Sequence, residues 1–277
     1  MASSRKTTAG AKRRPAPPAS KSTVKKRAAK AAGQSAAKGA YHHGALREAL
    51  IEASEALLAE RGTEGFSLRE VARRSGVSPA APAHHFGDVA GLLTAVATLA
   101  FDGLTAELRA GVERGGDDPA ARLREQGIGY VDFALRYPGR FGLMFRCLPD
   151  EAGEARRDDE ALSRSARAGF TVLEDGVRLL LGVPPDAPLA PVHWQAILST
   201  WSLVHGFAHL ALSGQFEQVL QGMAAARGAE LVSEGRTSGP GRIDRATLLR
   251  ELLSPMLDQQ ARGLLVPVPG AATSGPR

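Results

Sequence analysis

The sequence is poor in cysteine, with Cys147 as the single one among 277 residues. This excludes a disulfide framework and any zinc site that needs several cysteines. A fold that does not depend on disulfides suits a reducing compartment, so we expect a cytoplasmic protein. No run approaches the ~20 apolar residues that a membrane-spanning helix needs, and we expect no membrane partner. The 43% of hydrophobic residues is enough to build a core.

Lysine is absent from residues 41–277, because all seven lysines of the chain lie in residues 1–40. The body therefore has neither a P-loop lysine nor a lysine that could form a Schiff base. It also has no G-x-S-x-G or G-x-G-x-x-G motif. These absences predict that the protein is not an enzyme and needs no cofactor.

The charge is divided between a basic tail and a mildly acidic body. Residues 1–40 hold eleven basic residues and no acidic ones, which leaves 24 Arg against 29 Asp and Glu in residues 41–277. The tail consists mainly of Ala, Lys, Arg, Ser and Pro, so we expect it to be disordered. It has no apolar core of a secretory signal. We interpret it as an arm for nucleic-acid phosphates, with a solubilising extension or a targeting segment as alternatives.

Residues 46–104 carry helical periodicity, interrupted by short turns. Apolar residues recur every three or four positions in 46–61, and Gly62 ends this first helix. Ser67 and Glu70 form a capping-box pattern for a short second helix. After the turn at Gly76, a third helix of about two turns is predicted with Ser78 as N-cap and Pro79 at its first position. A helix, a glycine-containing turn and a second short helix are typical of a helix-turn-helix, although another all-α protein could contain such a hairpin.

The residues of this region resemble the DNA-binding domain of the TetR (tetracycline-repressor) family. The resemblance lies in Phe66–Ser78 (FSLREVARRSGVS), then His84-His85-Phe86 and Leu92-Leu93, and it covers about residues 41–104. It implies an all-α fold whose N-terminal three-helix helix-turn-helix domain joins a C-terminal helical domain for ligand binding and dimerisation. The resulting division is a disordered basic tail (1–40), a DNA-binding domain (41–90), a ligand-binding and dimerisation domain (91–265) and a flexible C-terminus (266–277).

The candidate DNA-binding residues come from this motif. At Ala83 the family usually has an aromatic residue and at Val89 often a lysine, and both positions commonly meet phosphate in relatives. Residues 41–90 contain five Arg and seven acidic residues, so the tail could supply the attraction that this domain lacks. Adjacent histidines on a helix point about 100° apart, which argues against a metal site. The predicted DNA-binding residues are Tyr41, His43, Ser67, Arg73, Arg74, Ser78, Pro79, Ala81, His84 and His85, with packing or a phosphate contact as the alternative for His85.

An aromatic cluster occupies residues 130–145, across a break at Pro138-Gly139. Aromatic side chains at helical spacing are typical of a core, and in an all-α regulator they can also form the wall of an apolar pocket. His205 is either a core imidazole satisfied by a backbone carbonyl or a polar anchor inside the pocket. The predicted pocket residues are Tyr130, Phe133, Tyr137, Phe141, Met144, Phe145, Trp201 and His205.

In residues 190–214, mainly apolar residues recur at alternating intervals of four and three positions, a pattern typical of the seam between packed helices. The residues of this seam are Trp194, Leu198, Trp201, His205, Ala208 and Leu212. Trp201, His205 and Gly206 also resemble the Trp-His-Gly signature of one branch of the TetR family. That family pairs two late helices of each subunit at a four-helix interface, which the resemblance assigns to residues 190–213 and 244–263. The segment between them predicts a loop or a loosely held helix. The predicted dimer residues are Trp194, Leu198, Leu212, Leu249, Leu252 and Met256.

These observations predict a DNA-binding transcriptional regulator: a ligand-responsive homodimeric repressor whose third helix reads a palindromic operator in double-stranded DNA. A nucleoid-type architectural protein that depends on the basic tail is the alternative. The sequence leaves open the apolar ligand, the operator, the target genes and the sign of regulation. It also leaves open whether the tail contacts DNA and whether the Trp-His-Gly helix lines the pocket or the dimer interface.

Overall fold

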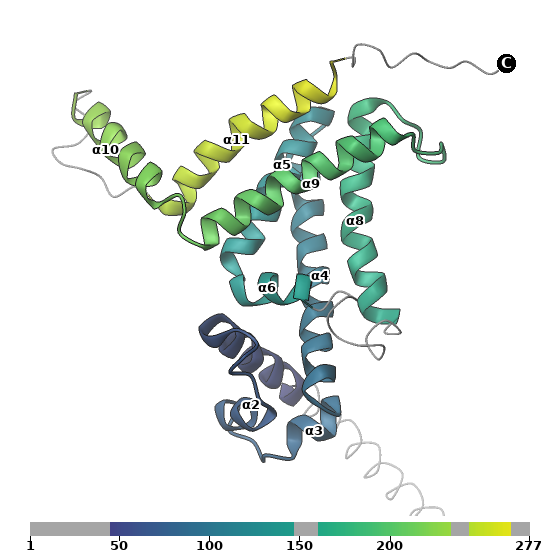
Figure 1. The fold of residues 1–277 in the computed structure, drawn as a ribbon, viewed down its shortest axis with the longest axis vertical. Coiled ribbons are helices and arrows are strands. Elements are labelled where there is room, and N and C mark those ends of the chain that lie inside the picture. The colour runs from purple at the N-terminus through teal and green to yellow at the C-terminus, as the bar shows by residue number, and fades with distance from the viewer. Residues whose placement is uncertain (1–44, 147–159, 234–243, 267–277) are drawn as a thin grey trace, which may run out of the picture. The chain divides into compact units, whose positions relative to one another are not determined.

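The computed structural model describes residues 45–146, 160–233 and 244–266, and every regular element in these ranges is a helix (Figure 1). The tail, Tyr41, His43 and residues 267–277 lie outside the described residues. An unlabelled first helix covers residues 45–61. The helices that follow are α2 (Leu68–Arg74), α3 (Ala81–Phe86), α4 (Val89–Arg114), α5 (Pro119–Arg136), α6 (Pro138–Arg146), α8 (Glu160–Leu181), α9 (Pro191–Leu212), α10 (Glu217–Ser233) and α11 (Arg245–Leu264).

The helix-turn-helix is present as predicted. Leu50, Leu57 and Val71 are fully buried in this region. Ser67 caps α2, since its hydroxyl accepts a hydrogen bond from the Glu70 amide at 3.3 Å. The turn between α2 and α3 passes through Gly76 at φ 68°, a conformation that a side chain would disfavour.

The start of α3 differs from the prediction. Ser78 is not the N-cap and Pro79 is not the first helical residue; α3 begins at Ala81, with Ala80 at the cap position. The reason is Pro82, which has no amide to donate to the Ser78 carbonyl. That carbonyl instead accepts from the Ala81 amide at 3.0 Å, which makes a turn of residues 78–81.

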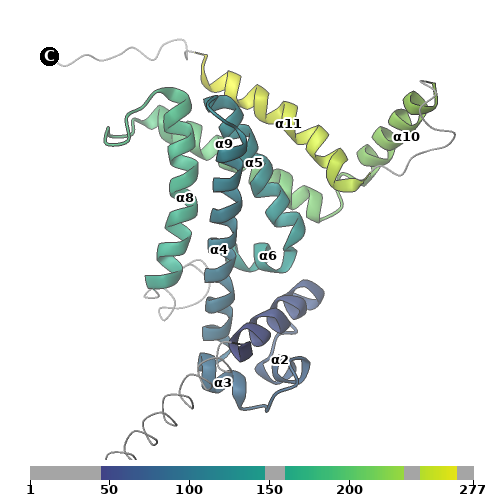
Figure 2. The ribbon, with the colours of Figure 1, turned by 180° about the vertical axis from the view of Figure 1, so that it is seen from behind.

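The remaining helices are organised around α4, which packs most extensively on α5 and α8 (Figures 1 and 2). Glycines allow the close crossing of α4 and α5. A Cβ at Gly111 would lie 2.5 Å from the Glu125 carbonyl oxygen, and one at Gly129 would lie 2.8 Å from the Glu107 carbonyl oxygen. By length and composition α4 could cross a membrane, but 50% of its most apolar window is buried inside the protein. Its apolar character is that of a core helix.

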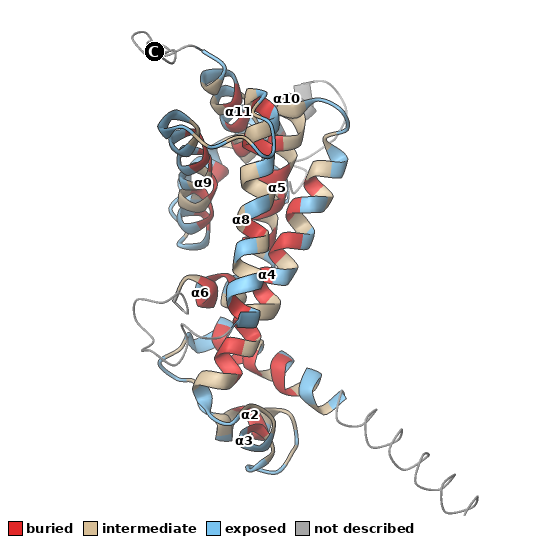
Figure 3. Cartoon of the chain, turned by 90° about the vertical axis from the view of Figure 1, so that its right-hand side faces the viewer, coloured by how far each residue is buried: buried red, intermediate tan, exposed pale blue. Residues whose placement is uncertain are grey.

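Helix α5 also packs on α9 and α11, and less extensively on α8 and α6. Helices α9 and α11 nearly coincide in sequence with the ranges predicted for the dimer interface, 190–213 and 244–263. The predicted seam does not form one exposed face of α9: Trp194, Leu198 and Leu212 are exposed, whereas Ala208 is fully buried and Trp201 and His205 are half-buried. Figure 3 shows this division between buried and exposed residues along the helix.

One expectation for the C-terminal part needs correction. Leu249 is only 1% exposed and packs inside the protomer, so it cannot contact a partner subunit; Leu252 is half-buried, and Met256 is exposed. For the segment between α9 and α11, predicted as a loop or a loosely held helix, the structure shows a helix, α10, over residues 217–233. The glycine-rich stretch that suggested a loop, 235–241, lies outside the described residues.

Candidate functional site: a DNA-binding surface and an apolar cavity

The turn before α3 and α3 itself present small and polar side chains to solvent. Ser78, Pro79 and His84 are exposed, and Ala81 and His85 are half-buried. The rings of His84 and His85 meet edge to face, 5.6 Å apart. The exposed residues form a narrow surface with little bulk, which can approach a groove floor closely.

Arg73 and Arg74, both predicted to meet phosphate, are held by carboxylates. Arg73 Nε and Nη2 donate to Glu70 at 2.8 and 2.7 Å, and its side chain is 69% exposed. Arg74 donates to Glu60 at 2.8 and 2.6 Å and to Glu70 at 3.1 Å, and its side chain is only 18% exposed. Arg73 is therefore accessible to an anion, whereas Arg74 ties α2 to the first helix.

The capping box is completed in only one direction. Glu70 was expected to reach back toward the cap, but its carboxylate accepts hydrogen bonds from both arginines. These bonds lower the pKa of Glu70 to about 2, with the larger effect from Arg73 and the smaller from Arg74. Glu70 consequently remains ionised at neutral pH and keeps one negative charge against the two arginines.

We predict that Glu70→Gln strengthens DNA binding by about threefold to tenfold and steepens its salt dependence by about one charge, since Arg73 becomes free for phosphate. The matched control is Glu64→Gln, which makes the same charge change at an exposed residue without a described ion pair. Fluorescence anisotropy at several salt concentrations measures both effects; equal gains for the two variants would contradict the release of Arg73.

The same pair tests the pKa of Glu70. A lowered pKa gives stability that is present above the unfolded value near 4 and is lost as the pH falls toward 2. Thermal unfolding of the wild type should therefore lose this contribution in that range, and Glu70→Gln should lack it.

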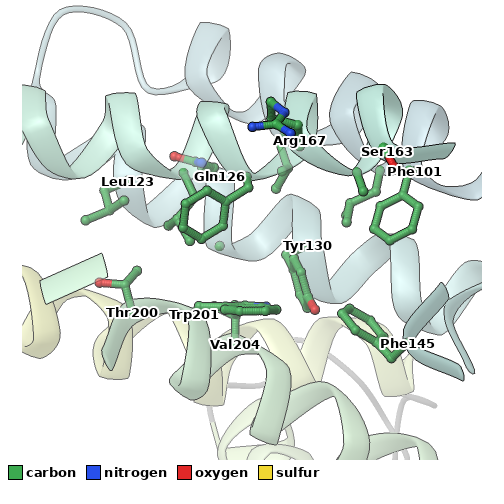
Figure 4. Close-up of a pocket in the computed structure, with 17 residues that line it drawn as sticks. Phe101, Leu123, Gln126, Tyr130, Phe145, Ser163, Arg167, Thr200, Trp201 and Val204 are labelled. Carbon is green, nitrogen blue, oxygen red and sulfur yellow. The ribbon is translucent and has the colours of Figure 1, made fainter. Parts of the chain in front are cut away.

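A cavity of about 410 Å³ lies between α4, α5, α8 and α9, with Phe145 of α6 at one end (Figure 4). This volume is within the range of small-molecule sites. Trp201 and Tyr130 lie on one side and α8 residues on the other. The lining residues are Phe101, Leu104, Leu108, Leu123, Gln126, Gly127, Tyr130, Phe145, Ser163, Ala166, Arg167, Gly169, Phe170, Leu173, Thr200, Trp201 and Val204.

Three of the eight predicted pocket residues line this cavity: Tyr130, Phe145 and Trp201. The other five do not. Three of them belong to the core, as the core interpretation of the aromatic cluster allows. Phe133, Phe141 and Met144 are fully buried, Tyr137 stacks under the Arg140 guanidinium, and His205 contacts the cavity wall from outside.

His205 supports Tyr130. The Tyr130 hydroxyl and His205 Nδ1 are 2.8 Å apart in a hydrogen bond, so the imidazole is satisfied by a phenol and not by a backbone carbonyl. Burial lowers the pKa of His205, and nearby His209 lowers it further. Burial raises the pKa of Tyr130. Both groups are thus neutral near pH 7, and together they fix the ring that faces the cavity.

The α8 side of the cavity was missed by sequence reasoning. Ser163, Arg167 and Phe170 come from this helix, and Gln126 of α5 was missed as well. The helical period of residues 160–181 predicts an amphipathic helix, but it does not predict which neighbours that helix faces. Gln126 lies three residues after Leu123 and four before Tyr130, and this helical spacing, which places it on the same face as two apolar residues, is a signal that could have been used.

Helix α6 contacts both the cavity and the first helix. Phe145 lines the cavity, while near the other end of α6 Arg140 pairs with Glu55 through contacts of 2.6 Å (Nε–Oε1) and 2.7 Å (Nη2–Oε2). Next to this ion pair, a Cβ at Gly139 would lie 2.8 Å from the Ala59 amide nitrogen. A displacement of α6 would therefore act directly on the first helix.

Comparisons with known proteins agree with this fold. The family model for bacterial regulatory proteins of the tetR family matches residues 50–96, and the model for the tetracyclin repressor-like C-terminal domain matches residues 123–253. No curated protein matched the chain.

Solved structures share the fold. A protein of unknown function from Rhodococcus sp. RHA1 is 27% identical, with a TM-score of 0.57, over 80% of this chain and 97% of its own. A TetR family transcription regulator from Marinobacter aquaeolei VT8 is 17% identical, with a TM-score of 0.51, over 79% and 97%. A putative fatty acid metabolism regulator from Clostridium perfringens is 12% identical, with a TM-score of 0.51, over 76% and 97%.

Proposed function

Because the chain belongs to the TetR family and is a DNA-binding transcriptional regulator, we propose that it is a homodimeric repressor whose DNA affinity is controlled by a small apolar molecule. Members of this family bind DNA and small molecules, typically form dimers and are generally not enzymes. We extend these properties to this chain, together with a cytoplasmic location.

The DNA contacts are assigned to α3 and its surroundings. Ser78, Pro79, Ala81 and His84 would face the bases in the major groove, and Ser67, Arg73 and His85 would contact phosphates. Arg74 is better explained as a structural residue, since Glu60 and Glu70 hold it. Tyr41 and His43 keep their proposed DNA-binding role on the resemblance alone.

The dimer is assigned to α9 and α11, which expose apolar side chains that a soluble monomer has little reason to expose. Trp194 is 42% exposed, Leu198 50% and Met256 40%. Leu212 extends this surface along α9, and Leu252 lies at its edge on α11. A symmetric pairing of these helices would cover these exposed apolar side chains and place two α3 helices on one duplex.

The observation that carries ligand control is the position of α6, with Phe145 at the cavity and Arg140 paired to Glu55 of the first helix. A molecule that fills the cavity and displaces Phe145 would move α6 and change the spacing of the two α3 helices. DNA affinity then falls by the ligand's differential affinity for the two states.

The test is selection of genomic DNA fragments with the purified full chain at moderate salt, followed by footprinting of the fragments recovered. We expect a short inverted repeat, protected on one face over successive turns of the helix. Uniform recovery without a motif would instead support the architectural alternative, in which the basic tail provides the affinity.

The tail gives a separate prediction. Deletion of residues 1–39, which removes eleven basic residues, should weaken binding to all sequences and flatten the salt dependence while preserving the preference for the repeat. Anisotropy titrations on specific and random duplexes measure this. Unchanged affinity and salt slope would show that the tail does not act on DNA.

A further inference from the structure

The cavity wall carries almost no charge. Among the described residues that line it there is no carboxylate, and Arg167, at an exposed position on α8, is the one ionised group. Thr200 is buried and donates its hydroxyl to the Ala196 carbonyl at 2.8 Å, so it offers only an acceptor. A cation would lose its hydration without gaining a counter-ion here, which disfavours a positively charged ligand.

Gln126 is the exception in this apolar wall. It lies beside Leu123, at the end of the cavity where Thr200 lies opposite (Figure 4). The residue is 2% exposed, and neither Nε2 nor Oε1 of its amide has a hydrogen-bond partner among the described residues. An amide left in this condition costs free energy, because its bonds to water are lost and not replaced.

The packing of α8 against α5 fixes the position of the Gln126 amide. Gly176 of α8 faces it so closely that a Cβ there would lie 2.6 Å from Gln126 Oε1. A larger residue at either position would close the space. Gln126 thus lines the cavity with the two N–H donors of Nε2 and the acceptor Oε1 all unused among the described residues.

We propose that the cavity takes an uncharged, mainly apolar molecule whose polar end is an amide or lactam, paired with the Gln126 amide through two hydrogen bonds. Gln126 Nε2 donates to the ligand carbonyl and Oε1 accepts from the ligand N–H, after a small rotation of the side chain toward the cavity. This inference rests on the proposed ligand cavity and specifies its ligand class. The aromatic and aliphatic wall from Leu108 to Phe145 holds the apolar part.

The experiment uses probes of one shape with different polar ends. Isothermal titration of the full chain compares octyl- and decyl-chain primary amides with the N,N-dimethyl amides, the alcohols and the ammonium salts of the same length. The dimethyl amide keeps the acceptor and lacks the N–H. We expect the primary amide to bind about tenfold more tightly than the dimethyl amide, since one hydrogen bond to a buried group is lost, and the ammonium to bind most weakly.

Gln126→Leu tests the residue itself. It should remove the preference for the primary amide and leave the unliganded protein at least as thermally stable as the wild type, because an unpaired amide is gone. Leu123→Met is the control, since it changes the same end of the cavity and keeps the amide. A wild type that binds all polar ends equally, or binds none of the probes, overturns the proposal, as does an unchanged preference in Gln126→Leu.

The proposed ligand class and the proposed repressor function can be contradicted separately. If the wild type protects an inverted repeat but shows no amide preference, only the ligand class is wrong. If no inverted repeat is found, the proposed repressor function fails whatever the titrations show.

Discussion

Replacing Ala83 with Glu is expected to reduce operator binding about hundredfold or more without loss of stability. Ala83 is exposed on α3, at the third helical position. A carboxylate there would face the phosphates beside the proposed groove contact, and like charges brought together cost several kcal/mol. In the free protein the same carboxylate sits in the first helical turn, where the helix dipole favours an acidic residue by about 0.3–1 kcal/mol. Folding and DNA binding should therefore respond in opposite directions.

The control is Ala106→Glu, the same substitution at an exposed alanine in the middle of α4. It adds the same charge to the chain but not to α3, so binding should change by no more than about twofold. Anisotropy with the selected DNA measures affinity, and thermal unfolding measures stability. Normal binding by Ala83→Glu would show that α3 does not enter the groove.

Much of the fold follows from local sequence signals. Apolar periodicity, the Ser67 cap and the glycine turn at Gly76 are short-range features, and the structure confirms each of them. The predicted start of α3 was two residues too early because two prolines compete for the first turn. Pro79 favours an early start, and Pro82 forbids the hydrogen bond that such a start requires.

The candidate site was harder to predict because it depends on which helix faces which. The period of residues 130–145 indicates an apolar face but does not distinguish Phe145, at the cavity, from Phe141, which is buried behind it. The same limit explains Leu249, which was assigned to the dimer and lies in the core. The ion pairs of Arg74 were missed for the same reason, because one of its two carboxylate partners, Glu60, lies fourteen residues earlier in the chain.

The contact of α6 with the first helix gives the second large prediction. Gly139→Ala places a Cβ 2.8 Å from the Ala59 amide nitrogen and 3.1 Å from the Glu55 carbonyl oxygen. Both are backbone atoms, so the helices must separate, and overpacking of this kind costs about 1–3 kcal/mol. The separation also strains the Arg140–Glu55 pair. We expect a lower free energy of unfolding and DNA binding weakened several-fold without any ligand.

Gly142→Ala is the matched control on the same helix. Among the described residues, a Cβ at Gly142 would have no atom beyond the adjacent backbone of its own helix within 4 Å. Alanine is favoured over glycine inside a helix by about 0.5–1 kcal/mol. This variant should therefore be slightly more stable than the wild type and bind DNA normally. Urea denaturation at one fixed protein concentration measures the free energy of unfolding, whose change from the wild type should differ between the two alanine variants in sign as well as in size. If Gly139→Ala were as stable as Gly142→Ala and bound DNA as well, α6 would not press on the first helix, and another route would have to connect the cavity to α3.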